Sequence, residues 1–178
     1  MKRNLLTLLA CVSMTSPAAA LDPPSPATAR VKGAAGADTT LKSAAGGRPT
    51  VVIVSKGHWC PICRDQLSST GRRSAALESL GAYALGLSAD SPKVNSEVSE
   101  ALGLPFPILS DQGGEVLDAL GLYSKRRKHA IPGLVFLDKC GDVAGVYKGR
   151  RPGSSQDLFI EERLRALLAQ TRNCRNAI

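Results

Sequence analysis

Two cysteines separated by two residues, Cys60 and Cys63, are the residues whose types and spacing most clearly indicate chemistry. They follow a β-branched run, Val51–Val54, and open a helical pattern at Pro61. A thiol at a strand-to-helix junction lies where unpaired backbone N–H groups and the helix dipole favour the reactive thiolate. The second thiol, one helical turn away, can then close an internal disulfide. This spacing predicts a redox pair that attacks a disulfide or a peroxide.

Two structural interpretations of the cysteine pair compete with redox chemistry. A structural zinc site usually needs a second pair of ligands with similar spacing, and Cys11, Cys140 and Cys174 do not supply one. A purely structural disulfide is the other interpretation, but a Cys-x-x-Cys bridge closes a very short loop and removes little chain entropy. The redox interpretation is favoured, and we expect neither a bound metal nor a cofactor.

Residues 1–20 are typical of a secretory signal peptide. Two basic residues precede a mostly apolar run, and Ala18–Ala20 supplies a small-residue cleavage site. A lipoprotein signal that would lipidate Cys11 is the alternative. The apolar run is too short for a transmembrane segment, and no later segment reaches about 18 continuous apolar residues. We therefore expect an exported, periplasmic protein without a transmembrane segment.

Cleavage after Ala20 would leave four cysteines, and an even number fits an oxidising compartment. Besides the spaced pair, Cys140 and Cys174 could form a structural disulfide. Four cysteines allow three connectivities, so the sequence leaves this pairing open.

The formal net charge of the 178-residue chain is +8, with basic clusters at Arg72–Arg73, Lys125–Lys128 and Arg150–Arg151. Aromatic residues make up only 4% of the chain and no nucleic-acid recognition motif is evident, so we expect no nucleic-acid partner. The clusters are interpreted as solvated surface, or as a surface that attracts acidic proteins.

The chain organises into three parts: the signal peptide, a flexible leader rich in Pro, Ala, Gly and Thr over 21–48, and one folded domain over 49–174. Within the domain, strand patterns alternate with helical patterns and end in a hairpin and a helix, which indicates an α/β sheet covered by helices. The predicted strands are 51–55, 82–87, 107–109, 134–137 and 143–148, and the predicted helices are 61–80, 93–102, 114–120 and 155–169.

The order of these elements resembles the thioredoxin-like fold, and more closely the alkyl hydroperoxide reductase/thiol-specific antioxidant family of peroxiredoxin-like redoxins. The resemblance spans roughly residues 49–150. Four blocks carry it: 57–64 (GHWCPICR), 87–92 (LSADSP), 104–111 (LPFPILSD) and 131–138 (IPGLVFLD). It implies a central mixed β-sheet flanked by helices, and an oxidoreductase.

The resemblance also implies a substrate groove beside the cysteines. Pro132 takes the position of a cis-proline that holds the substrate backbone near the nucleophile, a conformation only X-Pro bonds adopt at low cost. Trp59 and Ile131 would shape the same groove. His58, two residues before the first cysteine, would favour the thiolate when protonated, or would be an exposed loop histidine. His129 either faces the site or is solvated.

Further basic residues also lie near the motif. Arg64 is interpreted as a helix-surface residue. Lys125–Lys128 lies just before the proline loop and would give the site a basic rim. Neutralising these four residues should then slow the reaction with acidic partners, most strongly at low salt.

Departures from the family pattern decide between its two chemistries. Cys60 stands where the peroxidases have a peroxide-activating Thr, and Pro132 stands where they have an Arg. Val54 stands where many thioredoxins bury an Asp. The leading prediction is therefore a thiol–disulfide oxidoreductase in which Cys60 attacks protein disulfides and Cys63 resolves the adduct, with a thiol reductant or oxidant as its partner.

Two alternatives remain open. One is a thiol peroxidase that reduces hydroperoxides, with Cys63 or Cys60 as the peroxidatic thiol. The lesser one is a copper-binding thioredoxin-like chaperone, because copper-delivery factors with this fold use a cysteine pair with a histidine, here His129.

Overall fold

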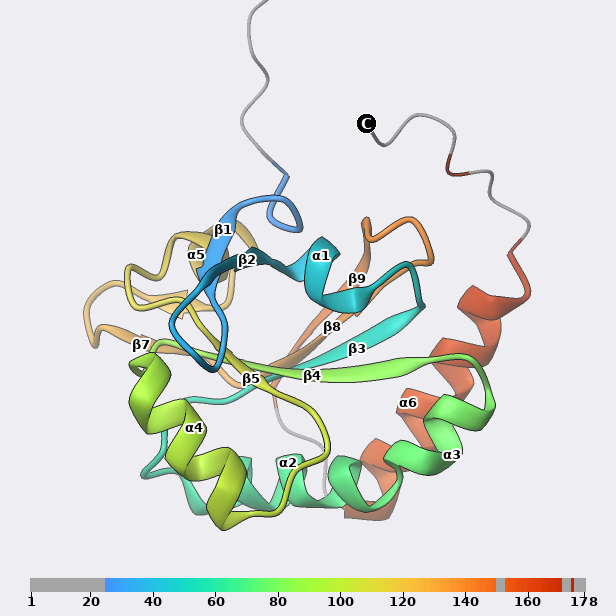
Figure 1. Ribbon diagram of the computed structural model, residues 1–178, viewed down its shortest axis with the longest axis horizontal. Helices are drawn as coiled ribbons and strands as arrows, with labels where there is room; N and C mark the ends of the chain where they lie inside the picture. The colour runs from blue at the N-terminus through green and yellow to red at the C-terminus, as the bar shows by residue number, and fades with distance from the viewer. Residues whose placement is uncertain (1–24, 150–152, 171–173, 175–178) are drawn as a thin grey trace, which may run out of the picture.

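The computed structural model describes residues 25–149, 153–170 and 174 (Figure 1). Nine strands and six helices lie in this part of the chain. The strands are β1 Arg30–Lys32, β2 Asp38–Thr40, β3 Thr50–Val54, β4 Tyr83–Ser88, β5 Ile108–Ser110, β6 Tyr123–Ser124, β7 His129–Ala130, β8 Gly133–Leu137 and β9 Val143–Lys148. The helices are α1 Leu41–Ala45, α2 Pro61–Arg72, α3 Ser74–Ser79, α4 Pro92–Ala101, α5 Glu115–Ala119 and α6 Gly153–Leu168.

Seven strands form one mixed sheet in the order β2-β1-β5-β4-β3-β8-β9. β3, β4 and β5 run parallel to one another, whereas β8 joins β3 in antiparallel register and β9 pairs back on β8. Helices α2, α3, α4 and α6 cover one face and α1 and α5 cover the other (Figure 1). The predicted mixed sheet flanked by helices is confirmed.

Strand β3, which pairs with β4 on one side and β8 on the other, leads directly into the loop that carries the cysteine motif. All five of its residues are buried. Val51 and Ile53 pack into the core beneath α2, α4 and α6, while Val52 and Val54 pack into the core on the opposite face. A strand covered on both faces reads as a continuous apolar run rather than an alternating one.

The prediction of a flexible leader over residues 21–48 is wrong from Arg30 onward. Strands β1 and β2 pair with each other, and β1 extends the sheet beside β5. Val31 and Leu41 are buried in the core, and Thr40 caps α1 by accepting a hydrogen bond from the Ser43 N–H at 3.0 Å. These elements are only three to five residues long, so they leave no sustained apolar period to detect. The predicted signal peptide, 1–20, lies outside the described residues.

Two local features differ from the predicted elements. The helix expected over 61–80 breaks at Arg73 into α2 and α3. A small hairpin, β6–β7, precedes the proline loop, and Lys128 in its turn has a positive φ of 50°. The hairpin expected over 134–148 is confirmed, and a disulfide joins Cys140 in its turn to Cys174 beyond α6. None of the helices in the described part of the chain combines the length and apolarity needed to cross a membrane.

Gly133 allows the proline loop and β9 to approach each other closely. A Cβ atom added at Gly133 would lie 2.6 Å from the Tyr147 carbonyl oxygen on β9. Backbone must move to accept it, so Gly133→Ala should lower the free energy of unfolding by about 1–3 kcal/mol. Gly33→Ala is the matched control, since its Cβ meets its nearest neighbour at 3.7 Å. Urea denaturation of both variants checks this, and equal stabilities would contradict it.

Candidate active site

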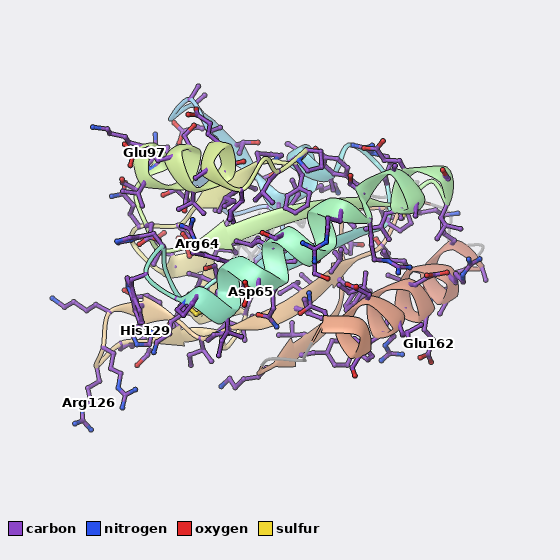
Figure 2. All side chains as sticks on the ribbon, turned by 90° about the horizontal axis from the view of Figure 1, so that it is seen from below. Arg64, Asp65, Glu97, Arg126, His129 and Glu162 are labelled. Atoms are coloured by element: carbon purple, nitrogen blue, oxygen red, sulfur yellow. A yellow bond between two sulfur atoms is a disulfide. The ribbon has the colours of Figure 1, made fainter. Side chains whose placement is uncertain are left out.

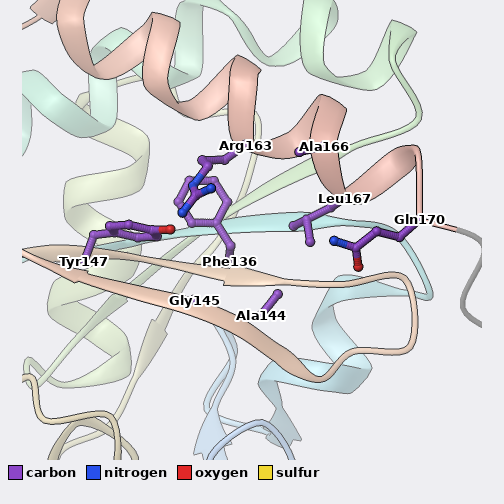
Figure 3. Close-up of a pocket in the computed structure, with 8 residues that line it drawn as sticks. All are labelled: Phe136, Ala144, Gly145, Tyr147, Arg163, Ala166, Leu167 and Gln170. Carbon is purple, nitrogen blue, oxygen red and sulfur yellow. The ribbon is translucent and has the colours of Figure 1, made fainter.

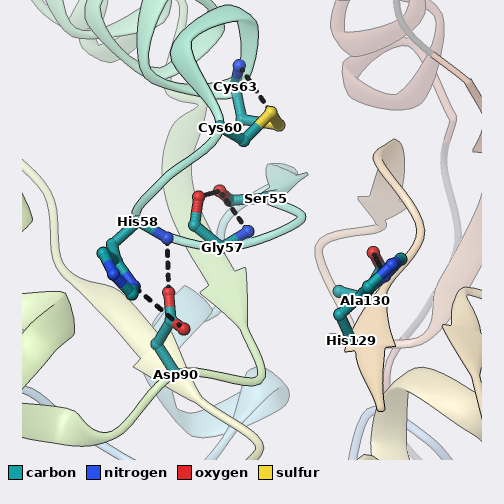
Figure 4. The surroundings of a disulfide bond; sticks show 8 residues. All are labelled: Ser55, Gly57, His58, Cys60, Cys63, Asp90, His129 and Ala130. Carbon is teal, nitrogen blue, oxygen red and sulfur yellow. Dashed lines mark hydrogen bonds and ion pairs between the residues drawn. A yellow bond between two sulfur atoms is a disulfide. The ribbon is translucent and has the colours of Figure 1, made fainter. Parts of the chain in front are cut away.

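Cys60 and Cys63 lie at the N-terminus of α2, and their sulfur atoms are bonded to each other (Figure 4). Cys60 is the N-cap residue with extended backbone, and its Sγ accepts a hydrogen bond from the Cys63 N–H at 3.3 Å. Pro61 takes the first helical position, where its missing N–H costs nothing. The N–H groups and dipole of the helix therefore favour negative charge on the Cys60 sulfur once the pair is reduced.

The two cysteines differ in exposure. Cys60 keeps 6% of its surface exposed, whereas Cys63 is fully buried. Cys60 is therefore the more accessible of the two residues to an incoming partner. This agrees with the predicted assignment of Cys60 as nucleophile and Cys63 as resolving thiol, although the roles themselves stay predictions.

A groove of about 470 Å³ opens beside Cys60. Trp59, Ile131 and Pro132, the residues expected to shape a substrate groove, all line it. The complete lining is Lys56, Trp59, Cys60, Pro61, Ile62, Ser124, Arg127, His129, Ile131 and Pro132. The structure thus brings together the motif at the start of α2, the β6–β7 hairpin and the proline loop before β8.

The expectation of a cis bond at Pro132 is wrong. No cis peptide bond occurs among the described residues, so the Ile131–Pro132 bond is trans. Trans is the intrinsically preferred isomer of an X-Pro bond. Hydrogen bonds fix the loop in this form: the Ile131 N–H donates to the Leu122 carbonyl at 2.7 Å, and the Pro132 carbonyl accepts from the Gly149 N–H at 2.8 Å.

Trp59 forms an exposed aromatic wall of the groove. Its side chain is 53% exposed, and its ring meets the His129 ring edge-on with 6.0 Å between centroids. The Lys56 Nζ lies 4.6 Å from the centroid of the same indole, within cation–π range. His129, for which facing the site was one of two open interpretations, therefore belongs to the groove.

His58 is not among the residues that line the groove. Figure 4 shows its ring turned toward Asp90, with its Nδ1 3.4 Å from the Asp90 Oδ1. The His58 backbone N–H also donates to the Asp90 Oδ2 at 2.7 Å. The side chain is 53% exposed, as the loop interpretation expected. The contact of His58 is thus a carboxylate, and the histidine that shares the groove with Cys60 is His129.

Asp90 holds the loop before Cys60 by its two contacts with His58, and these contacts were not predicted from the sequence. It follows β4, 32 positions from His58, so only the parallel pairing of β3 with β4 brings the two together. Two hydrogen bonds hold the backbone of Asp90 itself: the Ser110 hydroxyl donates to the Asp90 carbonyl, and the Asp90 N–H donates to the Ser88 hydroxyl at 3.1 Å. The sequence did offer one indication of this contact. Asp90 follows one predicted strand and the cysteine motif follows the neighbouring one, and the ends of parallel strands meet at the same edge of a sheet.

Removing the Asp90 carboxylate should loosen the loop before Cys60. We expect Asp90→Ala to lower the free energy of unfolding by about 1–2 kcal/mol, because the His58 N–H loses a charged acceptor. The exchange rate of Cys60 should also fall severalfold. Asp90→Asn keeps one acceptor oxygen and should recover part of both losses. Urea denaturation and exchange kinetics measure this; unchanged values for Asp90→Ala would show that the carboxylate does not position the loop.

The basic rim predicted from Lys125–Lys128 is only partly formed. Arg127 lines the groove. Lys125 instead donates to Asp118 at 2.8 Å, and this hydrogen bond raises the pKa of Lys125. Figure 2 shows Arg126 extending away from the body of the protein. Arg64 does not line the groove, in agreement with its interpretation as a helix-surface residue.

Two further features bear on where chemistry takes place. A second hollow of about 260 Å³ lies between the β8–β9 hairpin and α6 (Figure 3), where Arg163 lies over the Tyr147 ring. Its described lining contains no cysteine. Within the described ranges, no group of three or more His, Cys, Asp or Glu side chains is arranged to hold a metal ion.

The mixed sheet, its helices and the bonded pair at the start of α2 define a thioredoxin-like protein. The fold is similar to that of Xanthomonas campestris bacterioferritin comigratory protein, with a TM-score of 0.68 and 19% identity over 79% of this chain and 92% of that one. It is also similar to MTB DsbF, with a TM-score of 0.60 and 24% identity over 81% of this chain and 98% of that one.

A sequence model of the AhpC/TSA family matches residues 25–146, and the chain belongs to this family. A peroxiredoxin of Aeropyrum pernix is 30% identical over 107 residues, which are 51% of this chain and 43% of the relative. The thiol-disulfide oxidoreductase ResA of Geobacillus thermodenitrificans is 29% identical over 94 residues, 52% of this chain and 51% of the relative. The chain spans about half the length of these curated relatives.

Proposed function

We propose that the protein is an exported thiol–disulfide oxidoreductase that works through Cys60 and Cys63. The observation that carries the proposal is the bonded pair at the N-terminus of α2, in which Cys60, the more exposed of the two residues, lines an open groove. The relatedness to ResA, a thiol-disulfide oxidoreductase by name, supports the same chemistry.

The reaction begins from the reduced pair. The Cys60 thiolate attacks one sulfur of a substrate disulfide; a new S–S bond forms to Cys60 as the substrate bond breaks, and the departing thiolate takes a proton from water. The Cys63 thiolate then attacks the Cys60 sulfur, closes the Cys60–Cys63 bond and releases the second substrate thiolate. Two electrons pass to the substrate, and a thiol reductant restores the pair. The reverse sequence oxidises a dithiol substrate.

A turnover assay tests this proposal. The protein, in catalytic amount, should accelerate the reduction of a disulfide-bonded protein by dithiothreitol. A Cys60→Ser, Cys63→Ser double variant at the same concentration is the control, because it lacks only the two motif thiols and retains Cys140, Cys174 and the other groove residues. Equal rates with the native and the double-variant protein would refute the proposal.

The second candidate function is a thiol peroxidase. Membership of the AhpC/TSA family and the relatedness to peroxiredoxins favour it. Arg127 also places a cationic group in the groove. Against it, Cys60 and Pro132 replace the groups that activate peroxide in the family, and Cys63, in the peroxidatic position, is fully buried. Missing hydrogen bonds to the peroxide should leave its O–O bond poorly polarised.

Export is part of the proposal and rests on the signal-like residues 1–20 and on two bonded cysteine pairs, which persist in oxidising compartments. Mass spectrometry of the native protein should find an N-terminus at Leu21. A lipid on Cys11 would support the anchored alternative. An intact N-terminus on protein recovered from the cytoplasm would refute export.

A further inference from the structure

We propose that the groove beside Cys60 selects protein disulfides flanked by acidic residues, and that Lys56 and Arg127 are the residues that determine this preference. The inference rests on the proposed function and names the substrate class of the same site. Charge, surface chemistry and the arrangement of neighbouring cations each support it.

The charge of the groove has one sign. Lys56, Arg127 and His129 line it, and the described lining residues include no Asp or Glu. The two permanent cations come from different segments: Lys56 follows β3, and Arg127 lies in the turn between β6 and β7. Cations on two walls of a groove raise the local concentration of anionic groups and accelerate their encounter.

The exposed surface around Cys60 fits a polypeptide partner. Clusters of large, exposed hydrophobic side chains commonly mark a site of interaction with another protein or a ligand. Trp59 and Ile62, 53% and 47% exposed, flank Cys60 on either side in the sequence and line the groove with it. Exposed Trp and Arg side chains are the types that dominate binding energy at protein interfaces. Acidic side chains on the partner would then complement Lys56 and Arg127.

The basic residues next to Arg127 make it possible to distinguish the effect of a charge in the groove from the effect of the protein's net charge. Lys125 is already paired with Asp118, and Arg126 extends away from the protein (Figure 2). Only Arg127 of this turn lines the groove. Arg126 is therefore a matched control: it carries the same charge one position away, and its loss changes the net charge equally.

The experiment uses three synthetic peptides with one internal disulfide, identical except that Glu, Gln or Lys flanks the cysteines. Reduced full-length protein is mixed with each peptide at low and at high salt, and the rate of exchange is followed through Trp59 fluorescence. The acidic peptide should react fastest and the basic one slowest, and high salt should compress the difference. Lys56→Gln and Arg127→Gln should each reduce the preference for the acidic peptide over the neutral one about fivefold, the factor a unit charge gives at 4 Å in water.

Two controls make the result decisive. Arg126→Gln should retain the native preference, and Lys56→Glu, which reverses a groove charge, should weaken the preference further than Lys56→Gln. Equal rates for the three peptides would overturn the inference while leaving the proposed function intact. The same loss in Arg126→Gln as in Arg127→Gln would also overturn it, because net charge would then set the preference. No exchange with any peptide would overturn the proposed function and the selectivity together.

Discussion

Reduced Cys63→Ser protein mixed with a disulfide substrate should accumulate a stable mixed disulfide at Cys60. The helix N-terminus favours the Cys60 thiolate, and Cys60 lines the groove, so the first attack should still take place. Without the second thiol one turn away, nothing resolves the adduct. Cys60→Ser should form no adduct, because Cys63 is fully buried. Catalysed turnover should fall at least about a thousandfold in both variants.

Non-reducing gels and peptide mapping by mass spectrometry measure the adduct. Each variant should also be made together with Cys140→Ser and Cys174→Ser, which removes the other thiols that reduction would expose. Adduct formation by Cys60→Ser, with none by Cys63→Ser, would reverse the assigned roles. Such a result would favour Cys63 as the attacking, and hence peroxidatic, thiol.

Breaking the Cys140–Cys174 disulfide should have a large effect on stability. The bond connects residues 34 positions apart, tying the β8–β9 turn to the chain beyond α6. In the chain-entropy description, a loop of this length contributes about 3–4 kcal/mol by restricting the unfolded state. Cys174→Ser should therefore lower the free energy of unfolding by about that amount, measured by urea denaturation under non-reducing conditions.

The substitution is made at Cys174 because Cys140 is buried, and its N–H donates to the Asp138 Oδ1 at 2.9 Å. Leaving Cys140 in place avoids a cavity or a buried hydroxyl. Ser155→Ala, an exposed α6 position, is the control for handling the C-terminal region. A loss below about 0.5 kcal/mol would mean that the cross-link restricts the unfolded chain little. Exchange at Cys60 should be unaffected, since neither Cys140 nor Cys174 lines the groove.

The elements that could be predicted are those with strong local signals. The β-branched run of β3, the Pro61 start of α2 and the Ser91-Pro92 start of α4 each determine an element from a few residues. Strands β1 and β2 could not be predicted, because they have three residues each and one buried apolar side chain between them. Their stability comes from pairing with β5, which lies far along the chain.

The residues of the candidate site also fall into a group that the sequence predicted and a group that it did not. Cys60 and Cys63 were predicted from their spacing. Trp59, Ile131 and Pro132 were expected from the family resemblance, and they line one groove with Cys60, which is bonded to Cys63. The groove residues Lys56 and Ser124, and the Asp90 contact, depend on which strands lie side by side. Arg127 was expected as part of a basic rim, but which of Lys125–Lys128 lines the groove depends on the hairpin turn. The trans Ile131–Pro132 bond was not predicted, because the motif before β8 is compatible with either isomer of an X-Pro bond.

The most direct test of the central claim compares two oxidants of the same reduced protein. Trp59, the only tryptophan, lies beside Cys60 and reports closure of the pair in a stopped-flow fluorimeter. We predict rapid reaction with a disulfide-bonded peptide, and reaction with hydrogen peroxide no faster than that of a small free thiol. Peroxide reacting far faster than a small thiol, with slow reaction of the peptide, would contradict the account and establish a peroxidase.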